Sequence, residues 1–294
     1  MARGPRVIGP AGDVAEGPTL AMRDVSLRYA GAASTAIEDV SLVAQPGQVI
    51  AVVGRSGSGK STLARLVTGQ LRPTRGVIHV CGLDTTAVTP TVVAGRAGLV
   101  FQNPDHQLFA RSVADELRLG PQHAGVSGPE TDDRVREAAS ALQLEDVLGA
   151  HPAMLSMGLR KRVAVAAVLT MRPRLLVIDE PTTGRDAREA GWVADVVRTF
   201  AASGGTVVVV SHDLALVANT ANLVLVLAAG RVTASESPGV ILADEALLAA
   251  AGLEPPPLVR LALALDLGTG GTAPLTIDEV ERALRARLGW RPQP

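Results

Sequence analysis

Glycine, serine and lysine gather in the segment GRSGSGKST, which fits the pattern G-x-x-x-x-G-K-[ST] between an apolar run and a helical pattern. Glycines let the backbone wrap closely around a phosphate, so that N–H groups and the helix N-terminus face the anion. Lys60 would reach the β- and γ-phosphates, and the Ser61 hydroxyl would hold Mg²⁺. The alternative is a turn without ligand. The pattern predicts an ATP site contacted by Gly54, Arg55, Ser56, Gly57, Ser58, Gly59, Lys60, Ser61 and Thr62.

Two carboxylates end a second apolar run, LLVIDE, at Asp179 and Glu180. At the carboxyl end of a parallel strand, Asp179 would reach Mg²⁺ through a water molecule, and Glu180 would accept a proton from an attacking water. Taken alone, a solvated acidic pair at a strand end would be the better interpretation. Beside a phosphate-binding loop, the pair instead favours hydrolysis of a bound nucleotide.

A basic triplet at 160–162 suggests a nucleic-acid contact, but the composition argues against one. Aromatic residues make up 2% of the chain, too few for stacking platforms, and the net charge of −1 does not suit a phosphate backbone. We therefore expect no nucleic-acid partner. Lys60 and Lys161 are the two lysines among 28 basic residues, so position 60 is expected to need an ammonium rather than a guanidinium.

The elements that would position these residues follow from hydrophobic periodicity. Alternating and continuous apolar runs predict strands at 20–29, 37–44, 48–54, 97–101, 174–179, 205–211 and 223–232. The last is expected to be a hairpin through Ala229 and Gly230. Helical spacing predicts helices at 60–70, 112–119, 132–142, 156–171 and 187–202. The first two strands indicate a half-exposed antiparallel sheet, and the rest an α/β fold with a parallel sheet covered on both faces.

The ends of the chain differ from its middle in composition. We expect a flexible N-terminus at 1–18, rich in Gly and Pro, a main domain at 19–245 and a C-terminal extension at 246–294. The extension carries a capping box, Thr276 to Glu279, before a final amphipathic helix. No apolar stretch approaches the ~20 residues that span a bilayer, so we expect a soluble chain brought to any membrane by a partner. The single cysteine, Cys81, suits a reducing cytosol.

The motifs taken together, with VFQNPDHQLFA (100–110) and VVVVSHD (207–213), resemble the nucleotide-binding subunit of an ABC transporter over roughly residues 19–245. The resemblance implies an ABC-type fold: a mostly parallel core with an antiparallel β subdomain and a helical subdomain. It also implies that Gln102 contacts Mg²⁺ and the lytic water, and that His212 contacts the γ-phosphate. Either residue could instead be a polar side chain that closes a strand.

The resemblance implies further contacts at three places. Tyr29 would stack on adenine, although it could instead pack against a sheet. Asp186 would act across a dimer, although it could be the N-cap of the helix at 187–202. Ser156 and Gly158 belong to the signature that contacts the nucleotide of a second subunit. In this chain Met157 and Leu159 replace a glycine and a glutamine of that signature, and Arg185 replaces an apolar residue.

A narrower resemblance lies in FQNPDHQLFARSVADELRLGP, which is similar to the ATPases of energy-coupling factor importers. It implies import of a vitamin or a transition-metal ion. The implied partners are a second ATPase subunit, which we expect to differ from this one, a transmembrane coupling protein and a substrate-binding membrane component. The implied location is peripheral, at the cytoplasmic face of the membrane. The alternatives are another ABC transporter ATPase, a soluble ABC ATPase acting on ribosomes or DNA, and a regulatory subunit that binds ATP without hydrolysis.

Overall fold

A computed structural model of the chain describes residues 9–10, 17–182 and 187–288, with side chains left out at 187–189. Within these residues the strands form a six-stranded sheet in the order β10-β9-β3-β8-β7-β6 and a four-stranded sheet in the order β2-β1-β4-β5. The strands are β1 (Leu20–Leu27), β2 (Ile37–Ala44), β3 (Val49–Val53), β4 (Arg75–Val80), β5 (Leu83–Asp84), β6 (Ala97–Val100), β7 (Leu175–Asp179), β8 (Thr206–Val210), β9 (Leu223–Ala228) and β10 (Arg231–Glu236).

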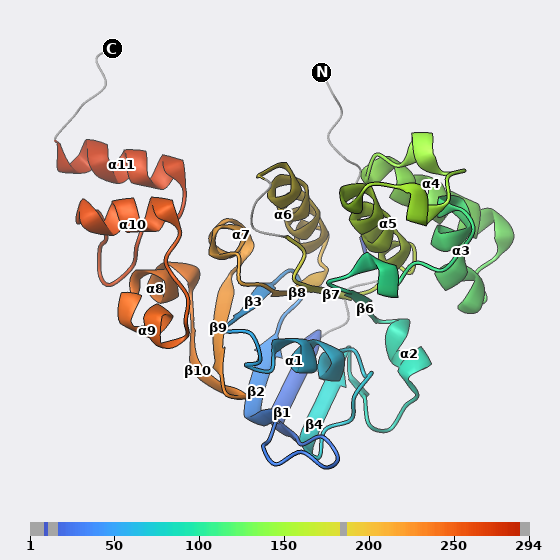
Figure 1. Ribbon diagram of the computed structural model, residues 1–294, viewed down its shortest axis with the longest axis horizontal. Helices are drawn as coiled ribbons and strands as arrows, with labels where there is room; N and C mark the ends of the chain where they lie inside the picture. Colours follow the sequence, from blue (N-terminus) through green and yellow to red (C-terminus); the bar gives the residue numbers. More distant parts are fainter. Residues whose placement is uncertain (1–8, 11–16, 183–186, 289–294) are drawn as a thin grey trace.

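The helices cover both faces of the larger sheet, as Figure 1 shows. They are α1 (Lys60–Val67), α2 (Pro90–Ala94), α3 (Val113–His123), α4 (Gly128–Ala141), α5 (Met157–Leu169), α6 (Ala187–Ala202), α7 (Leu214–Thr220), α8 (Pro238–Ala243), α9 (Glu245–Ala250), α10 (Pro257–Ala264) and α11 (Ile277–Arg287). Short 3₁₀ turns lie at Pro104–His106, Glu145–Val147 and Pro152–Met154. None of the described helices combines the length and the apolar composition needed to cross a bilayer.

The larger sheet confirms the predicted parallel core. Strands β9, β3, β8, β7 and β6 pair in parallel, and every residue of β3 and β8 is buried. Burying such Val and Ile side chains contributes about 1.5–3 kcal/mol each. The predicted hairpin is also confirmed, because β10 pairs antiparallel with β9 through a turn in which Ala229 and Gly230 have φ angles of 47° and 80°.

Helix α1 lies between the two sheets. Its buried side chains, Leu63, Ala64, Leu66 and Val67, join a core that contains residues of β1, β2 and β4 on one side and of β3, β7 and β8 on the other. On the opposite face of the larger sheet, α3, α4, α5 and α6 share a second core. The phosphate-binding loop and the ends of β7 and β8 are thus fixed by packing on both faces.

The C-terminal helices α8 to α11 are stacked beside β9 and β10, away from α3 and α4 (Figure 1). Residues of α8, α9 and α10 join a third core with β3, β9 and α7. The predicted capping box is confirmed: the Thr276 hydroxyl accepts from the Glu279 backbone, and the Glu279 side chain accepts from the Thr276 backbone. The proposed division at residue 245 would fall at the first residue of α9.

The predicted helix at 112–119 was too short. Helix α3 continues to His123, past Pro121, because Pro121 is buried on the same face as Leu117 one turn earlier. Helices α2 and α7 were not among the predicted elements, since helical runs of five to seven residues span too few turns to show a helical period.

Candidate functional site

The phosphate-binding loop joins β3 to α1 and is pressed against neighbouring backbone. Gly54 and Gly59 have φ angles of 150° and 107°, where side chains other than glycine are strained. A Cβ atom at Gly54 would lie 2.1 Å from the carbonyl oxygen of Leu227, and a Cβ atom at Gly59 would lie 2.6 Å from that of Ala36. The loop is therefore held against the end of β9 and the segment before β2, and glycine is needed at both positions.

The Lys60 side chain is 8% exposed and lies inside this loop. Its Nζ donates to the carbonyl oxygens of Gly54 at 2.8 Å and Arg55 at 3.1 Å, and lies 4.0 Å from Oε1 of Glu180. An ammonium carries three donors that reorient easily. The cation is thus held where phosphate oxygens would replace some of these carbonyl contacts.

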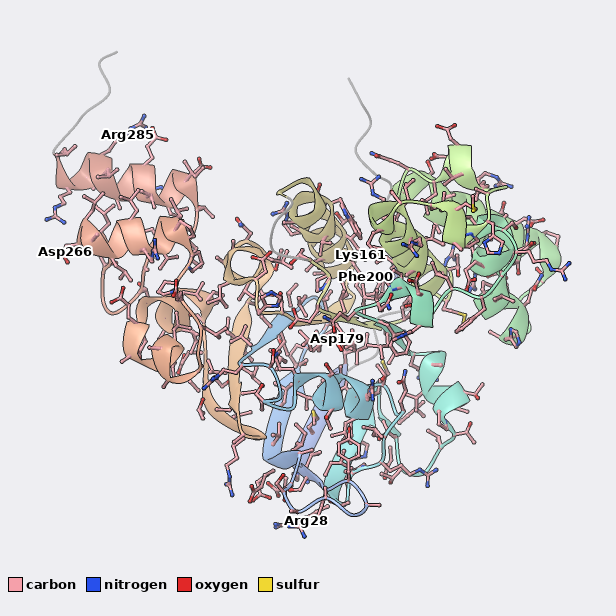
Figure 2. The ribbon with its side chains drawn as sticks, in the orientation of Figure 1. Arg28, Lys161, Asp179, Phe200, Asp266 and Arg285 are labelled. Carbon is pink, nitrogen blue, oxygen red and sulfur yellow. The ribbon has the colours of Figure 1, made fainter. Side chains whose placement is uncertain are left out.

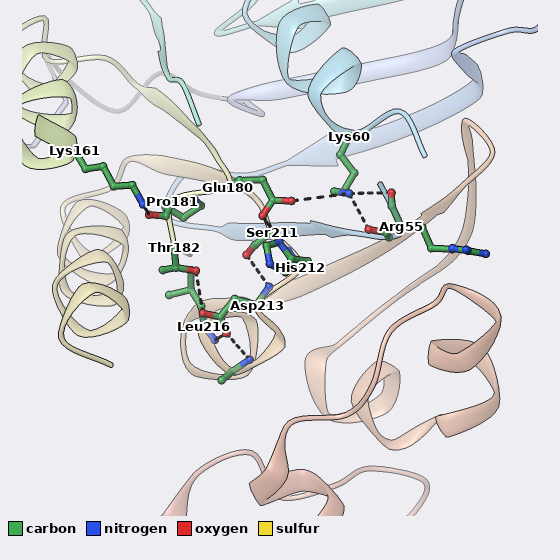
Figure 3. A network of polar contacts seen from close by, with 12 residues as sticks. Arg55, Lys60, Lys161, Glu180, Pro181, Thr182, Ser211, His212, Asp213 and Leu216 are labelled. Carbon is green, nitrogen blue, oxygen red and sulfur yellow. Dashed lines mark hydrogen bonds and ion pairs between the residues drawn. The ribbon is translucent and has the colours of Figure 1, made fainter. Parts of the chain in front are cut away.

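The two carboxylates predicted from LLVIDE lie at and just beyond the end of β7, beside this ammonium. The Glu180 backbone has a φ of 47°, in the left-handed region, and its N–H donates to Val210 at 2.8 Å. Its side chain is 13% exposed, and Oε2 lies 2.6 Å from Nδ1 of His212. The His212 backbone N–H also donates to this oxygen, at 3.3 Å. The structure therefore brings together Lys60, Glu180 and His212 from three parts of the chain, as Figure 3 shows.

Asp179 and Ser61 offer oxygen ligands beside this cluster. The Ser61 hydroxyl lies close enough to the Asp179 carboxylate to affect its pKa, while Oδ1 of Asp179 is buried with no hydrogen-bond partner in the described part of the chain. Burial raises the pKa of Asp179, the nearby Glu180 raises it further, and the Ser61 hydrogen bond and Lys60 lower it. A buried carboxylate oxygen without a partner beside a hydroxyl is the donor set that Mg²⁺ prefers, so the residues fit this ion.

Tyr29 lies beyond the end of β1, at the other end of the phosphate-binding loop. Its hydroxyl lies 3.1 Å from that of Thr62, and the side chain is 40% exposed. The ring lines an open surface depression together with Arg28 and Thr35. An exposed aromatic ring bonded to the phosphate-binding loop is available for stacking, which a ring packed inside a sheet would not be.

Gln102 is exposed two residues beyond β6, and with Lys161 and Pro181 it lines a small pocket beside the end of β7. A second glutamine, Gln107, organises this loop. Its Nε2 donates to the carbonyl of Ala164 in α5 at 2.7 Å, and its Oε1 accepts from the Phe101 N–H at 3.2 Å. The loop that carries Gln102 is therefore attached to α5.

The start of α5 carries the remaining candidates. Ser156 is the N-cap residue and its hydroxyl accepts from the Leu159 N–H at 3.4 Å. A Cβ atom at Gly158 would meet nothing within 4 Å, and Met157 is 44% exposed. Among the described residues, no hydrogen bond or ion pair joins Ser156 or Gly158 to the phosphate-binding loop. The structure therefore does not bring these two residues together with the loop of their own chain.

Comparison with known proteins decides the family. The ABC transporter domain matches residues 37–183. The EcfA2 ATP-binding protein of an energy-coupling factor transporter, from Symbiobacterium thermophilum, is 40% identical over 261 residues, which cover 87% of this chain and 91% of that protein. The chain belongs to the ABC transporter ATP-binding family.

A second relative of full length resembles this ABC ATPase to a similar degree. A cobalt import ATP-binding protein, CbiO of Rhodobacter capsulatus, is 36% identical over 93% of this chain and 98% of its own length. The energy-coupling factor ATPases are thus the relatives that the sequence resembles in detail. A putative ABC transporter ATP-binding protein of Caldanaerobacter subterraneus is also 36% identical, but this chain spans only 42% of it.

Solved structures confirm the fold of the ABC ATPase. The cbiO1 protein of Clostridium perfringens, described as part of the ABC transporter complex cbiONQ, matches 85% of this chain at a TM-score of 0.72 and 28% identity. A dimeric ABC cassette in a post-hydrolysis state, bound to ADP and Pi, matches at a TM-score of 0.68. At 24% identity the second likeness supports the fold alone.

Two of the residues named from the sequence are not among those described in this ABC ATPase, and one residue with several contacts was not predicted. Asp186 and Arg185 lie outside the described residues. Asp213 was not singled out, yet its side chain accepts from the Thr182 hydroxyl at 3.0 Å and from the Ala215 and Leu216 N–H groups at the start of α7. An aspartate directly before an apolar helical run is an N-cap signal that could have identified it.

Proposed function

We propose that this chain is the ATP-hydrolysing subunit of an energy-coupling factor type importer for a transition-metal ion or a vitamin. The likeness to EcfA2, CbiO and cbiO1 supports this branch of the family. The observation that carries hydrolysis is the meeting of Lys60, Glu180 and His212 beside the unpartnered oxygen of Asp179.

The residues divide the reaction among them. Lys60 binds the β- and γ-phosphates, and the backbone N–H groups of the loop orient them. Glu180 takes a proton from the attacking water, and the bond from His212 holds the carboxylate in place. Ser61 and Asp179 would hold Mg²⁺, and Gln102, which follows β6, would contact it as well. When bound, the ion neutralises charge on the phosphates.

Adenine binds over Tyr29, whose hydroxyl lies against Thr62. Stacking on an aromatic ring contributes about 1–3 kcal/mol per base and adds little chemical selectivity. Tyr29 thus places the nucleotide without taking part in the reaction.

The membrane partner docks at a groove between α2 and α3, which also contains residues of α5 and is lined in part by Phe109 and Glu116. Phe109 is 77% exposed, and buried Glu116 accepts from the Phe109 and Ala110 N–H groups at 2.7 Å each. The carboxylate thereby holds this loop with its aromatic residue in solvent. An amphipathic helix of the coupling protein fits such a groove.

Two neighbours of Phe109 in this segment are held within the chain. Leu108 is half-buried and packs against the core shared by α3 to α6. Asp105 is 2.6 Å from Arg160 of its own chain. Phe109 is therefore the residue of this segment that we propose for docking.

The ATPase works as a heterodimer at the cytoplasmic face of the membrane. Met157 and Leu159 stand where the signature has glycine and glutamine, and the exposed Met157 side chain would crowd a phosphate approaching the start of α5. The site closed by this helix start is the slower one of the pair. The site that contains Glu180, closed by a partner with an intact signature, is the faster one.

Isolation of the membrane complex through this chain tests the proposal. We expect a second ATPase and an integral membrane protein to be recovered, and the complex to hydrolyse ATP. Phe109→Asp should reduce recovery about 10-fold or more, since truncating an exposed aromatic anchor removes ≥2 kcal/mol of binding. Val77→Asp, at a half-exposed position on β4 outside the groove, is the control. Recovery of ribosomes or DNA, or of a complex with no ATPase activity, would favour one of the alternatives.

A further inference from the structure

Both lysines of the chain are buried to the same degree, on either side of Glu180. The chain has 28 Lys and Arg residues, and lysine occurs only at 60 and 161. Each of the two side chains is 8% exposed. A compact ammonium fits an enclosed position that a planar guanidinium with its five donors would not fill in the same way. Position 161, like position 60, is therefore expected to require an ammonium rather than a guanidinium.

Lys161 lies on α5 and contacts the segment that carries the catalytic carboxylate. Its Nζ donates to the carbonyl oxygen of Pro181 at 3.1 Å. Pro181 directly follows Glu180 in the chain. Figure 3 shows Lys60 and Lys161 reaching this segment from opposite sides. Figure 2 shows Lys161 and Asp179 near the centre of the view, far from Asp266 and Arg285 in the C-terminal part of the chain.

The surroundings make this hydrogen bond strong. Lys161 lines a small pocket with Gln102 and Pro181, and most of the remaining lining is apolar, including Ile178, Val165 and Trp192. A hydrogen bond from an ionised donor is roughly twice as strong as a neutral one, and a low local dielectric strengthens it further. The bond thus fixes the Pro181 carbonyl firmly relative to α5.

Glu180 needs such support because its backbone is in the left-handed region, with φ at 47°. A residue other than glycine stays there only when its surroundings hold it. Val210 holds the Glu180 N–H on one side, at 2.8 Å. On the other side the fixed ring of Pro181 and the bond from Lys161 hold the following peptide.

We propose that Lys161 is a positioning residue that fixes the Glu180–Pro181 backbone, and thereby the carboxylate, for attack of water on ATP. The proposal rests on the hydrolytic function assigned to Glu180 above. Lys161 belongs to the same helix as Ser156 and Gly158, so the bond also joins the helix start that faces a second subunit to the carboxylate of its own chain.

Kinetics of the assembled complex with Lys161→Met test the role. Methionine keeps the length and apolar character of the side chain and removes the donor. We expect kcat to fall about 10-fold or more, because a displacement of about 1 Å of a catalytic group costs up to 10²-fold in rate. The KM for ATP should change less than about twofold, since the phosphate-binding loop is untouched. Lys161→Gln retains a hydrogen-bond donor, so its kcat should lie between those of wild type and Lys161→Met.

The matched control is Arg162→Met, the next residue of α5. Arg162 donates to Gln143 and lies over the Trp192 ring, and it has no contact with Glu180 or Pro181 among the described interactions. This variant should keep kcat within about twofold of wild type. The melting temperature of the Lys161→Met protein should lie at most several degrees below that of the control, because leaving the Pro181 carbonyl without this donor costs about 1–3 kcal/mol.

A double-mutant cycle distinguishes positioning from general damage. In single-turnover assays on Glu180→Gln protein, adding Lys161→Met should lower the rate less than about twofold, because Lys161 acts through the missing carboxylate. An equal loss in both backgrounds, unchanged kcat in Lys161→Met, or loss of nucleotide binding would overturn the proposal. Fast hydrolysis by the Glu180→Gln single variant would instead refute the proposed function. Because this result does not involve Lys161, it is distinguishable from failure of the proposal on Lys161.

Discussion

Each nucleotide site of the proposed dimer would have two parts. One is the phosphate-binding loop with the end of β7, and the other is the start of α5 from the second subunit. In this chain the two parts differ in how complete they are. The first is closed within the chain: Lys60 contacts two loop carbonyls, Glu180 contacts His212, and the glycines press against β9. The second is open. Met157 is 44% exposed and Gly158 has no neighbour that a Cβ would touch.

This difference teaches where each part acts. Groups that their own chain already places together are preorganised for chemistry there, because they need to move little when substrate binds. A helix start whose N-terminal residues face solvent is free to bind a ligand from another molecule. In the proposed dimer that ligand is the nucleotide of the second subunit.

The largest expected effect comes from removing catalytic or binding groups of the closed part. Glu180→Gln should lower turnover by about 10² or more while ATP still binds, because a positioned general base contributes about 10²–10⁴ in rate. Lys60→Ala should weaken ATP binding as well, since it removes the cation from the phosphates. Phosphate release and binding of a fluorescent ATP analogue measure the two quantities. Normal turnover by the Glu180→Gln complex, with the partner's glutamate also replaced, would refute the assignment.

A smaller effect concerns the buried carboxylate of the closed part. The pKa of Asp179 is raised, mainly by burial, so the folded state holds this proton more tightly than the unfolded state. The stability from this group is therefore present below its unfolded pKa and is lost as pH rises through the folded pKa. Without nucleotide, Asp179→Asn should be at least as stable as wild type at neutral pH, which thermal melts would show.

The same substitution should remove the effect of Mg²⁺ on nucleotide binding. Asparagine keeps the shape and loses the charge, so ATP affinity should become nearly independent of Mg²⁺. Asp213→Asn is a control that alters a nearby aspartate bonded to Thr182 and α7. If Asp179→Asn binds ATP with an undiminished response to Mg²⁺, the ion is held elsewhere.

The smallest expected effect comes from a substitution in the open part, at the start of α5. Met157→Gly should speed hydrolysis only at the site of the second subunit, by less than the 10²–10³ that loss of a whole oxyanion donor costs, because the backbone N–H is present in both proteins. The measurement is turnover with Glu180 already replaced by glutamine, so that the second site alone is observed. A fully active homodimer of this chain would contradict the unequal pair from which this expectation comes.

Much of the fold was predictable because it depends on local patterns. Continuous apolar runs such as those of β3, β7 and β8 are unambiguous strands, and the loop at 54–62 has one backbone path that its glycines permit. The capping box at Thr276 and the turn at Ala229 and Gly230 are decided by neighbours in sequence. In each case the deciding interaction spans a few residues.

Other features depend on packing between distant segments. Leu108 packs against the core of α3 to α6 although the neighbouring Phe109 is exposed, and Asp105 is paired with Arg160 of α5. Sequence alone does not show that burial, because it depends on which face of one element meets another.

The sequence by itself determined the phosphate-binding loop, the carboxylates at the end of β7 and the order of strands and helices, since each is written in contiguous residues. Only the tertiary structure decided that Glu180 meets His212 and Lys60, and that Lys161 reaches Pro181 from α5. Those contacts join residues 20 to 120 positions apart. They form because sheet pairing and two packed cores bring the strand ends and the start of α5 to the same edge.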